Sequence, residues 1–393
     1  MDFQLDEEQR ALRNLALDLA ERRFRHRAAE IDRTEEYPYD NAEALVQANL
    51  MGMTLPSRYG GQDRTLLDAV LCVEQVARVC ATTARIIVEG NTGTALAISH
   101  YGSEAQKQKY IPMIVAGEKP CICITEPEAG SAATDMKTSA TQVADGYILN
   151  GNKCWITGAG IANVYLVLAR FGGEGGTVGI GGIIVDKGTP GFTVGRRTPM
   201  MGIRGLPEAE LIFQDCLVPQ SNLLVLEQGF KKLMQVYNSQ RVGAATVALG
   251  IAQGAMEEAV KYSIERHQFG QPISDFQGLR WMLSDMSIQV EAGRWLLYRA
   301  AANAGHGLPD MDEAAIAKTF IGEMAITVTN NALQVFGGYG YSRDLPLERM
   351  VRDARMFTIG GGTSQMMRNV IGHGIVARGN GHKTDAQTTP ARG

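Results

Sequence analysis

The spacing of the apolar residues changes twice along this 393-residue chain, and those changes constrain its fold more than any single motif. Up to about residue 118, apolar residues recur at helical spacing: Asp6 and Gln9 stand in capping-box spacing, and Leu12, Leu15 and Leu19 follow on one face. Over 120–219, short β-branched or aromatic runs alternate with glycine-rich turns, as in an antiparallel sheet. Over 229–378 the helical spacing returns. The sequence therefore predicts helices, then a sheet, then helices.

Local patterns within these thirds give more specific expectations. In the first third, helices are expected over 42–51, 66–79 and 82–98. In the middle third, Asn150-Gly151 lies between two apolar runs and predicts a tight hairpin turn. In the last third, the Ala- and Gly-rich stretch 243–259 predicts helices packed closely against other helices.

We therefore expect an α+β protein in four segments. These are an N-terminal helical domain (1–118), a middle antiparallel β-domain (119–220), a C-terminal helical bundle (221–378) and a tail (379–393). The two helical domains are expected to share one core, with the β-domain docked on its side. The tail has almost nothing to bury and is expected to be disordered.

The composition excludes several classes of partner. Lys and Arg total 38 against 42 Asp and Glu, so there is no basic surplus for nucleic acid. The acidic, polar start gives no sign of a secretory signal, and no apolar run approaches the ~18 residues of a membrane span. The six cysteines form no CxxC pair, so we expect buried, reduced thiols, no metal site and a reducing compartment, the cytoplasm.

Two motifs of the β-domain suggest ligand contacts, but each has an ordinary structural interpretation. The sequence TEPEAGS, from Thr125 to Ser131, is a turn after a strand whose glycine and serine could also approach an anion. In KCWIT, Trp155 and Thr157 share one face of a strand. The indole could flank the flat ring of a ligand, or it could pack in the core. The segments 265–270 and 334–340 are equally ambiguous alone.

Taken together and in order, five motifs resemble those of the acyl-CoA dehydrogenase family: TEPEAGS, KCWIT, ERHQFGQPI, QVFGGYGY and RDARMFTIGGGT. The resemblance covers roughly residues 1–378 and includes the helix–sheet–helix order. It implies that FAD binds between the β-domain and the C-terminal helices. It also implies a homotetramer, a dimer of dimers, acting on an acyl-CoA thioester.

The resemblance implies two sets of FAD-binding positions. The first set surrounds the flavin and its phosphates: Ile122, Cys123, Ile124, Thr125, Gly130, Ser131, Trp155, Ile156, Thr157, Thr363 and Gln365. The second set holds the FAD of a neighbouring subunit: Arg266, Phe269, Gln334, Gly337 and Gly338.

The base that dehydrogenation requires is missing. Dehydrogenation needs an ionised group that takes the α-proton while the flavin accepts hydride. The family supplies a Glu before a Gly-Thr pair, or one before an Arg on the first long C-terminal helix. Here these positions hold Gly361 and Gln240, and neither side chain can ionise. Ordinary dehydrogenation is therefore not expected.

A lone charge, Arg85, stands in the apolar run 79–88. A buried guanidinium needs an acceptor. One interpretation is an internal ion pair with Glu74 or Glu89, or a snorkelling side chain. The other is a fork that binds a carboxylate or sulfinate of the substrate.

Arg85, Gln240 and Gly361 together resemble one branch of the family, the desulfinases of 3-sulfinopropionyl-CoA. This branch implies hydrolysis of a carbon–sulfur bond to give propionyl-CoA and sulfite, which is redox-neutral and needs no electron-transfer flavoprotein. The catalytic candidates are Arg85, which recognises the sulfinate, and Gln240, which orients the acyl chain. Further substrate-binding candidates are Ser131, Tyr237, Asn238 and Arg241.

Two other functions remain open at this level. One is a dehydrogenase or enoyl-CoA reductase with an unrecognised base, and the other is a FAD-binding homologue without catalysis. The sequence also leaves open the role of flavin N5 and the group that supplies the proton.

Overall fold

The computed structural model describes residues 4–172 and 175–380. Its N-terminal part is helical, and the expected capping box forms where Asp6 accepts from the backbone of Gln9. The helices are α1 (Glu7–Leu19), α2 (Ala28–Thr34), α3 (Tyr39–Gln47), α4 (Leu66–Ala77), α5 (Ala81–Asn91), α6 (Thr94–Tyr101) and α7 (Glu104–Val115).

The single helix expected over 82–98 is wrong, because α5 ends at Asn91 and α6 begins at Thr94. Between them Gly93 has φ 54°, and a Cβ there would lie 2.7 Å from the Gln240 side-chain oxygen. The Gly93 amide donates to the Ser239 hydroxyl instead of continuing the helix. The break therefore brings the backbone of the α5–α6 link against α8 (Gly229–Glu265).

The middle of the chain forms a sheet in the order β6-β7-β3-β2-β4-β5-β8. It differs from the expected antiparallel sheet because two pairings are parallel, that of β1 with β4 and that of β2 with β4. The strands are β1 (Pro120–Cys123), β2 (Ser139–Val143), β3 (Gly146–Thr157), β4 (Val164–Arg170), β5 (Ile180–Asp186), β6 (Phe192–Thr198), β7 (Glu208–Pro219) and β8 (Leu223–Val225).

The hairpin turn expected at Asn150-Gly151 is wrong, since β3 continues through both residues. The register of β3 against β7 shifts here instead. The Asn150 side chain exchanges two hydrogen bonds with Asp215 of β7, which fixes this irregularity. Gly151 has φ 145°, and a Cβ there would meet Thr138 at 2.6 Å. The dipeptide therefore forms a bulge.

The C-terminal part is helical, as expected. It contains α8, α9 (Gln277–Ala304), α10 (Met311–Phe336), α11 (Leu347–Arg355) and α12 (Ser364–Gly379), with the short hairpin β9 (His267–Gln268) and β10 (Gln271–Pro272) between α8 and α9. The expected tail falls mainly on 381–393, outside the described residues.

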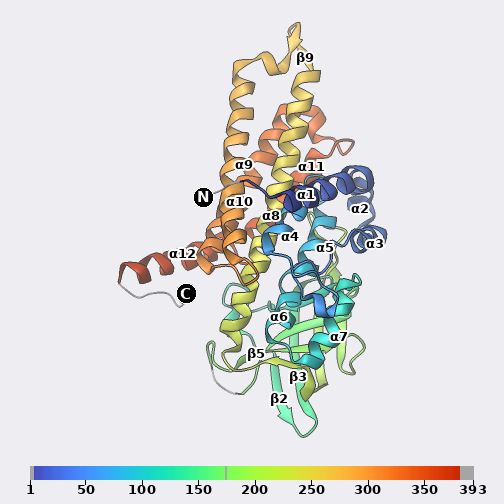
Figure 1. Cartoon of the computed structure of the whole chain (residues 1–393), viewed down its shortest axis with the longest axis vertical. Coiled ribbons are helices and arrows are strands. Elements are labelled where there is room, and N and C mark those ends of the chain that lie inside the picture. The colour runs from blue at the N-terminus through green and yellow to red at the C-terminus, as the bar shows by residue number, and fades with distance from the viewer. Residues whose placement is uncertain (1–3, 173–174, 381–393) are drawn as a thin grey trace.

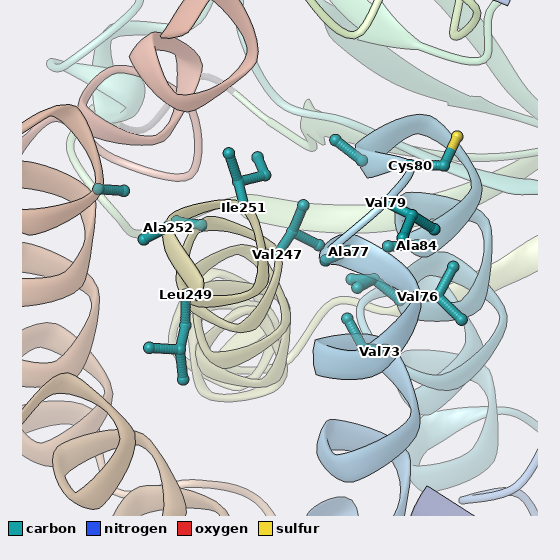
Figure 2. Packing of buried hydrophobic residues seen from close by; sticks show 14 of the residues in the cluster. Val73, Val76, Ala77, Val79, Cys80, Ala84, Val247, Leu249, Ile251 and Ala252 are labelled. Carbon is teal, nitrogen blue, oxygen red and sulfur yellow. The ribbon is translucent and has the colours of Figure 1, made fainter. Parts of the chain in front are cut away.

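The two helical parts share one core, as predicted, with α8 at its centre. Figure 2 shows Val247 of α8 pointing toward Ala77 of α4. A Cβ at Gly250 would lie 2.6 Å from the Glu74 carbonyl oxygen, so the helices approach closely only because this position is glycine.

The long helices α8, α9 and α10 run along the long axis of the molecule (Figure 1). The β9 hairpin lies at one end of these helices and the sheet at the other, beside α6 and α7. A second core joins the sheet to α6, α7 and the start of α8. In the described part of the chain, no helix combines the length and apolar character needed to cross a membrane.

Candidate active site

A buried ion pair shapes the TEPEAGS loop. The Lys153 ammonium is fully buried and donates to Glu126 Oε1 (2.8 Å) and to the Ile124 carbonyl (2.9 Å). Burial lowers the pKa of Lys153, whereas Lys153 and the backbone amides of Lys137 and Thr138 hold the pKa of Glu126 below its usual value although burial opposes this. The loop that carries the candidates Thr125, Gly130 and Ser131 is therefore fixed from within.

The candidates of KCWIT lie on an irregular end of β3. The register against β7 shifts between Lys153 and Ile156, and Trp155 has φ 56°, an unusual conformation for a bulky residue. Its indole ring is 58% exposed. Ile156 and Cys123 are buried in the core of the sheet, so only their backbone groups can reach a ligand.

The second set of FAD candidates gathers at the far end of the helices. The Tyr262 and Phe336 rings stack there, and the Arg266 guanidinium lies over the Tyr339 ring. The Phe269 side chain is 94% exposed. This end of the molecule lies opposite the sheet in Figure 1, so within one chain the second set of FAD candidates does not contact the first set.

Arg241 links Gln240 and Gly361, the two positions where the family resemblance expects a base. Arg241 follows Gln240 on α8, and its Nε donates to the Gly361 carbonyl (3.3 Å). Its guanidinium also donates to Asn238 (2.7 Å) and lies over the Tyr237 ring. These substrate-binding candidates therefore form one face with the loop before α12.

Lys318 of α10 lies behind this loop and was not singled out from the sequence. It is buried, and its ammonium donates to the Gly362 carbonyl. Burial, together with the Arg241 charge, lowers the pKa of Lys318 to about 8. The nearest atom to a Cβ built at Gly361 is Lys318 Cε, at 3.9 Å, so no side chain of the described residues fills the space beside Gly361.

Arg85 forms an ion pair with Glu89, as one interpretation of the sequence expected. The contact joins Arg85 Nη2 to Glu89 Oε1 at 2.7 Å, and both side chains are buried. Glu74, the other partner considered, instead accepts from Arg294 and Tyr298. The Arg85 Nε atom is buried without a hydrogen-bond partner among the described residues.

Glu89 also pairs with Lys119, the residue before β1. Lys119 is buried and donates to the Thr157 carbonyl at 2.8 Å. Burial alone would lower the pKa of Lys119, but the Cys121 thiol and the Glu89 carboxylate hold it above its usual value. Arg85, Lys119 and Glu89 are called here the charged cluster; two cations and one anion leave it one positive charge.

A small cavity lies beside the charged cluster. Its walls bring α5, β1, β3 and α8 together: Glu89, Thr92, Thr94, Lys119, Pro120, Cys121, Ile122, Thr157 and Gln240. One end of the Gln240 carboxamide contacts the Thr92 hydroxyl at 2.7 Å. The candidates Gln240 and Thr157 thus share a cavity, and Arg85 reaches its edge through Glu89.

Glu208, the first residue of β7, joins this region and was not foreseen. Its Oε1 accepts from the Thr157 hydroxyl at 2.5 Å, and its side chain is 9% exposed. Burial raises the pKa of Glu208 to about 7, against the opposing effects of Thr157, Arg85 and Lys119. The only signal in the sequence was its place opposite Thr157 in the β3–β7 pairing, which cannot be read without the register.

Comparison with known proteins identifies the family. The chain matches the acyl-CoA dehydrogenase N-terminal domain over 6–118, the middle domain over 121–216 and the C-terminal domain over 227–376. It therefore belongs to the acyl-CoA dehydrogenase family. A solved butyryl-CoA dehydrogenase from Megasphaera elsdenii is 38% identical, with a TM-score of 0.93 over 96% of this chain and 100% of that one.

A more similar relative is the 3-sulfinopropanoyl-CoA desulfinase of Paraburkholderia xenovorans (strain LB400). It is 52% identical over 374 residues, which cover 94% of this chain and 96% of the relative. A solved complex of PigA with FAD and proline is 26% identical, with a TM-score of 0.89 over 98% of this chain and 100% of that one.

The first set of candidates fits a flavin. The exposed Trp155 ring, turned outward by the bulge, offers a flat apolar surface. A Cβ built at Gly130 would have no neighbour within 4 Å, so the loop leaves its backbone open to an anion. The TEPEAGS loop and the β3 bulge are held next to each other, because Lys153 anchors the loop and lies only two residues before Trp155 in the bulge.

Replacing Lys153 with Met should destabilise the protein, because Glu126 would remain buried with its charge unpaired. We expect a loss of about 3–5 kcal/mol in the free energy of unfolding, measured by denaturant titration. Lys137→Met, the same change at an exposed side chain, is the control and should stay within about 0.5 kcal/mol of the wild type. Equal stability of the two variants would contradict the role of the ion pair.

Replacing Glu208 with Gln should change how stability depends on pH. The folded pKa of about 7 is above the ordinary value of 4.5, so the contribution of the neutral carboxyl is complete below pH 4.5 and lost as pH rises through 7. Glutamine stays neutral. The variant should therefore gain up to about 3 kcal/mol over the wild type between pH 5 and pH 8.

The measurement is the melting temperature of both proteins across that pH range. Glu210→Gln changes an exposed carboxylate two residues along β7 and serves as the control. A gap between Glu208→Gln and the wild type that does not widen with pH would show that Glu208 is ionised like an exposed side chain.

Proposed function

We propose that the protein removes sulfur from 3-sulfinopropionyl-CoA, giving propionyl-CoA and sulfite. The observation that carries this proposal is a positively charged cluster beside an acyl site without an α-proton base. Gln240 and Gly361 cannot take a proton from carbon, and the cluster has one positive charge for an anionic acyl end. The 52% identity to a desulfinase supports the same reaction.

FAD is the cofactor of this proposal. The TEPEAGS loop, Trp155 and Thr157 would hold it on the β-domain, with Thr363 and Gln365 at the start of α12. The second set of candidates, at the far end of the helices, would hold the FAD of a second copy in a homotetramer. This set is Arg266, Phe269, Gln334, Gly337 and Gly338. When bound, the flavin supplies a flat, electron-poor surface against which the acyl chain is positioned.

The chain's own residues have the following roles. Arg85 would donate to the sulfinate through its buried Nε, which has no hydrogen-bond partner among the described residues. The neighbouring Nη2 donates to Glu89. Gln240, held by Thr92, would fix the acyl chain. Tyr237, Asn238 and Arg241 would contact the thioester or pantetheine, with Ser131 on the opposite side. Arg85, Asn238, Gln240 and Arg241 are buried, which keeps water away from them and strengthens each charge contact.

The reaction is redox-neutral, so no electron-transfer flavoprotein is required. Sulfur leaves at the level of SO2 and becomes sulfite with water, while carbon keeps the electron pair and gains a proton. The six buried thiols fit a reducing compartment, and we place the protein in the cytoplasm.

The decisive assay is an anaerobic incubation with 3-sulfinopropionyl-CoA without an electron acceptor. We expect sulfite release with an unbleached flavin spectrum. Flavin bleaching by a saturated acyl-CoA would instead indicate a dehydrogenase with an unrecognised base, and FAD binding without any turnover would indicate a non-catalytic homologue. Either result would overturn the proposal.

Replacing Arg85 with Lys should abolish most desulfination, because an ammonium cannot reproduce the planar guanidinium fork. We expect kcat/KM to fall about 100-fold or more, which corresponds to about 3 kcal/mol. Arg22→Lys, at an exposed ion pair with Asp18, is the matched control and should retain wild-type activity. Sulfite release by Arg85→Lys at the control's rate would remove Arg85 from sulfinate recognition.

A further inference from the structure

One buried group near the cavity has no role in the reaction as described so far. Glu208 Oε2 is buried and has no hydrogen-bond partner among the described residues, while Oε1 contacts the Thr157 hydroxyl. A buried carboxyl oxygen without a partner is costly. Such an oxygen is tolerated where it carries a proton or faces a ligand.

We propose that Glu208 holds the proton that replaces sulfur on carbon, and that the Thr157 hydroxyl transfers it into the cavity. The inference rests on the proposed desulfination and supplies its proton donor. Glu208 itself does not line the cavity, whereas Thr157 does. Glu208 therefore acts through Thr157 and is a proton-holding, positioning residue.

The contact between the two side chains supports a relay. Thr157 has a single hydroxyl hydrogen, and its oxygen lies 2.5 Å from Glu208 Oε1. When Glu208 is ionised, that hydrogen must point to the carboxylate. When Glu208 is protonated, it can donate to the Thr157 oxygen, and the threonine hydrogen is then free to point into the cavity. The protonation of Glu208 thus decides whether Thr157 donates to the substrate.

The β3–β7 pairing holds the relay in place. Thr157 and Glu208 are direct partners across the two strands. The Thr157 carbonyl accepts from the Lys119 ammonium (2.8 Å) and the Cys121 thiol (2.9 Å), so its backbone is fixed beside the charged cluster. The relay therefore ends where the cluster would hold the sulfinate group.

Protons and electrons balance in this reaction with water as the only other reactant. The carbon–sulfur bond breaks, the electron pair stays on carbon and SO2 leaves. Thr157 gives its proton to that carbon and receives the Glu208 proton. Water then adds to SO2 to give hydrogen sulfite and one proton, and that proton restores Glu208.

The charges around Glu208 suit a donor that is neutral before the reaction. Arg85 and Glu89 face it from α5, Lys119 and Cys121 from the start of β1, and Tyr237 from α8. Burial is the main cause that raises its pKa to about 7. An anionic sulfinate at the cluster favours the neutral carboxyl further, because like charges disfavour ionisation.

The first test compares kcat and its pH dependence in the assembled holoenzyme. We expect Glu208→Gln to lower kcat about 100-fold or more while KM changes little, because only the proton is lost. Wild-type kcat should fall as pH rises above about 7, where Glu208 ionises, and this fall should be absent in the variant. Glu208→Asp keeps an ionisable carboxyl and should retain the fall.

Two further variants test the relay. Thr157 is also a candidate for FAD binding, so kcat is measured per bound FAD. Thr157→Val keeps the branched shape without the hydroxyl and should lose kcat as Glu208→Gln does. Thr157→Ser keeps the hydroxyl and should retain most of the wild-type kcat. Glu210→Gln on the same strand is the control and should leave kcat and its pH dependence unchanged.

A measurement without substrate separates proton storage from activity. An infrared carbonyl band that weakens through pH 7 to 8 should be present in the wild type and absent in Glu208→Gln, whereas the buried Asp353 carboxyl, with a pKa raised to about 6, titrates at a lower pH. The band of Glu208 should persist in Thr157→Val. If Glu208→Gln has wild-type kcat and the wild-type pH dependence, or no such band titrates, Glu208 is not the proton store. If the wild type releases no sulfite, the proposed function fails first, and this inference fails with it.

Discussion

The ion pairs of Glu89 are the constraint on which the site depends. One buried carboxylate holds two buried cations, Arg85 from α5 and Lys119 from the start of β1. Burying either cation in that position without an acceptor would be costly. Glu89 therefore joins the helical domain to the sheet electrostatically, and the arrangement leaves a net positive charge at the junction, where an anionic substrate end can replace lost hydration.

Close packing brings the remaining groups to the same junction. Glycines on α8 let α4 and α5 approach its backbone, and the break at Gly93 leaves room for the Gln240 carboxamide. The same helix carries Arg241, which contacts the loop at Gly361. The proposed acyl site thus lies at the interface between α8 and its neighbours, and any side chain added at these glycines would separate the groups that form it.

The sequence predicted the helix–sheet–helix order and offered an ion pair of Arg85 with Glu74 or Glu89 as one of two interpretations, of which the pair with Glu89 forms. These features are local or follow from family motifs. It could not reveal Glu208, whose partner Thr157 lies fifty-one positions earlier and meets it only through strand register. The expected turn at Asn150 failed for a similar reason, because its hydrogen-bond partner, Asp215, is distant in the chain.

The backbone differs between Gly361 and Gln240, the two positions where the family resemblance expects a base. Gly361 has φ 75°, so a glutamate there would have room for its side chain but would strain the main chain by about 1 kcal/mol or more. Gln240 sits in an ordinary helix, and glutamate has nearly the same shape. A carboxylate would therefore be introduced at lower cost on α8 than in the glycine loop.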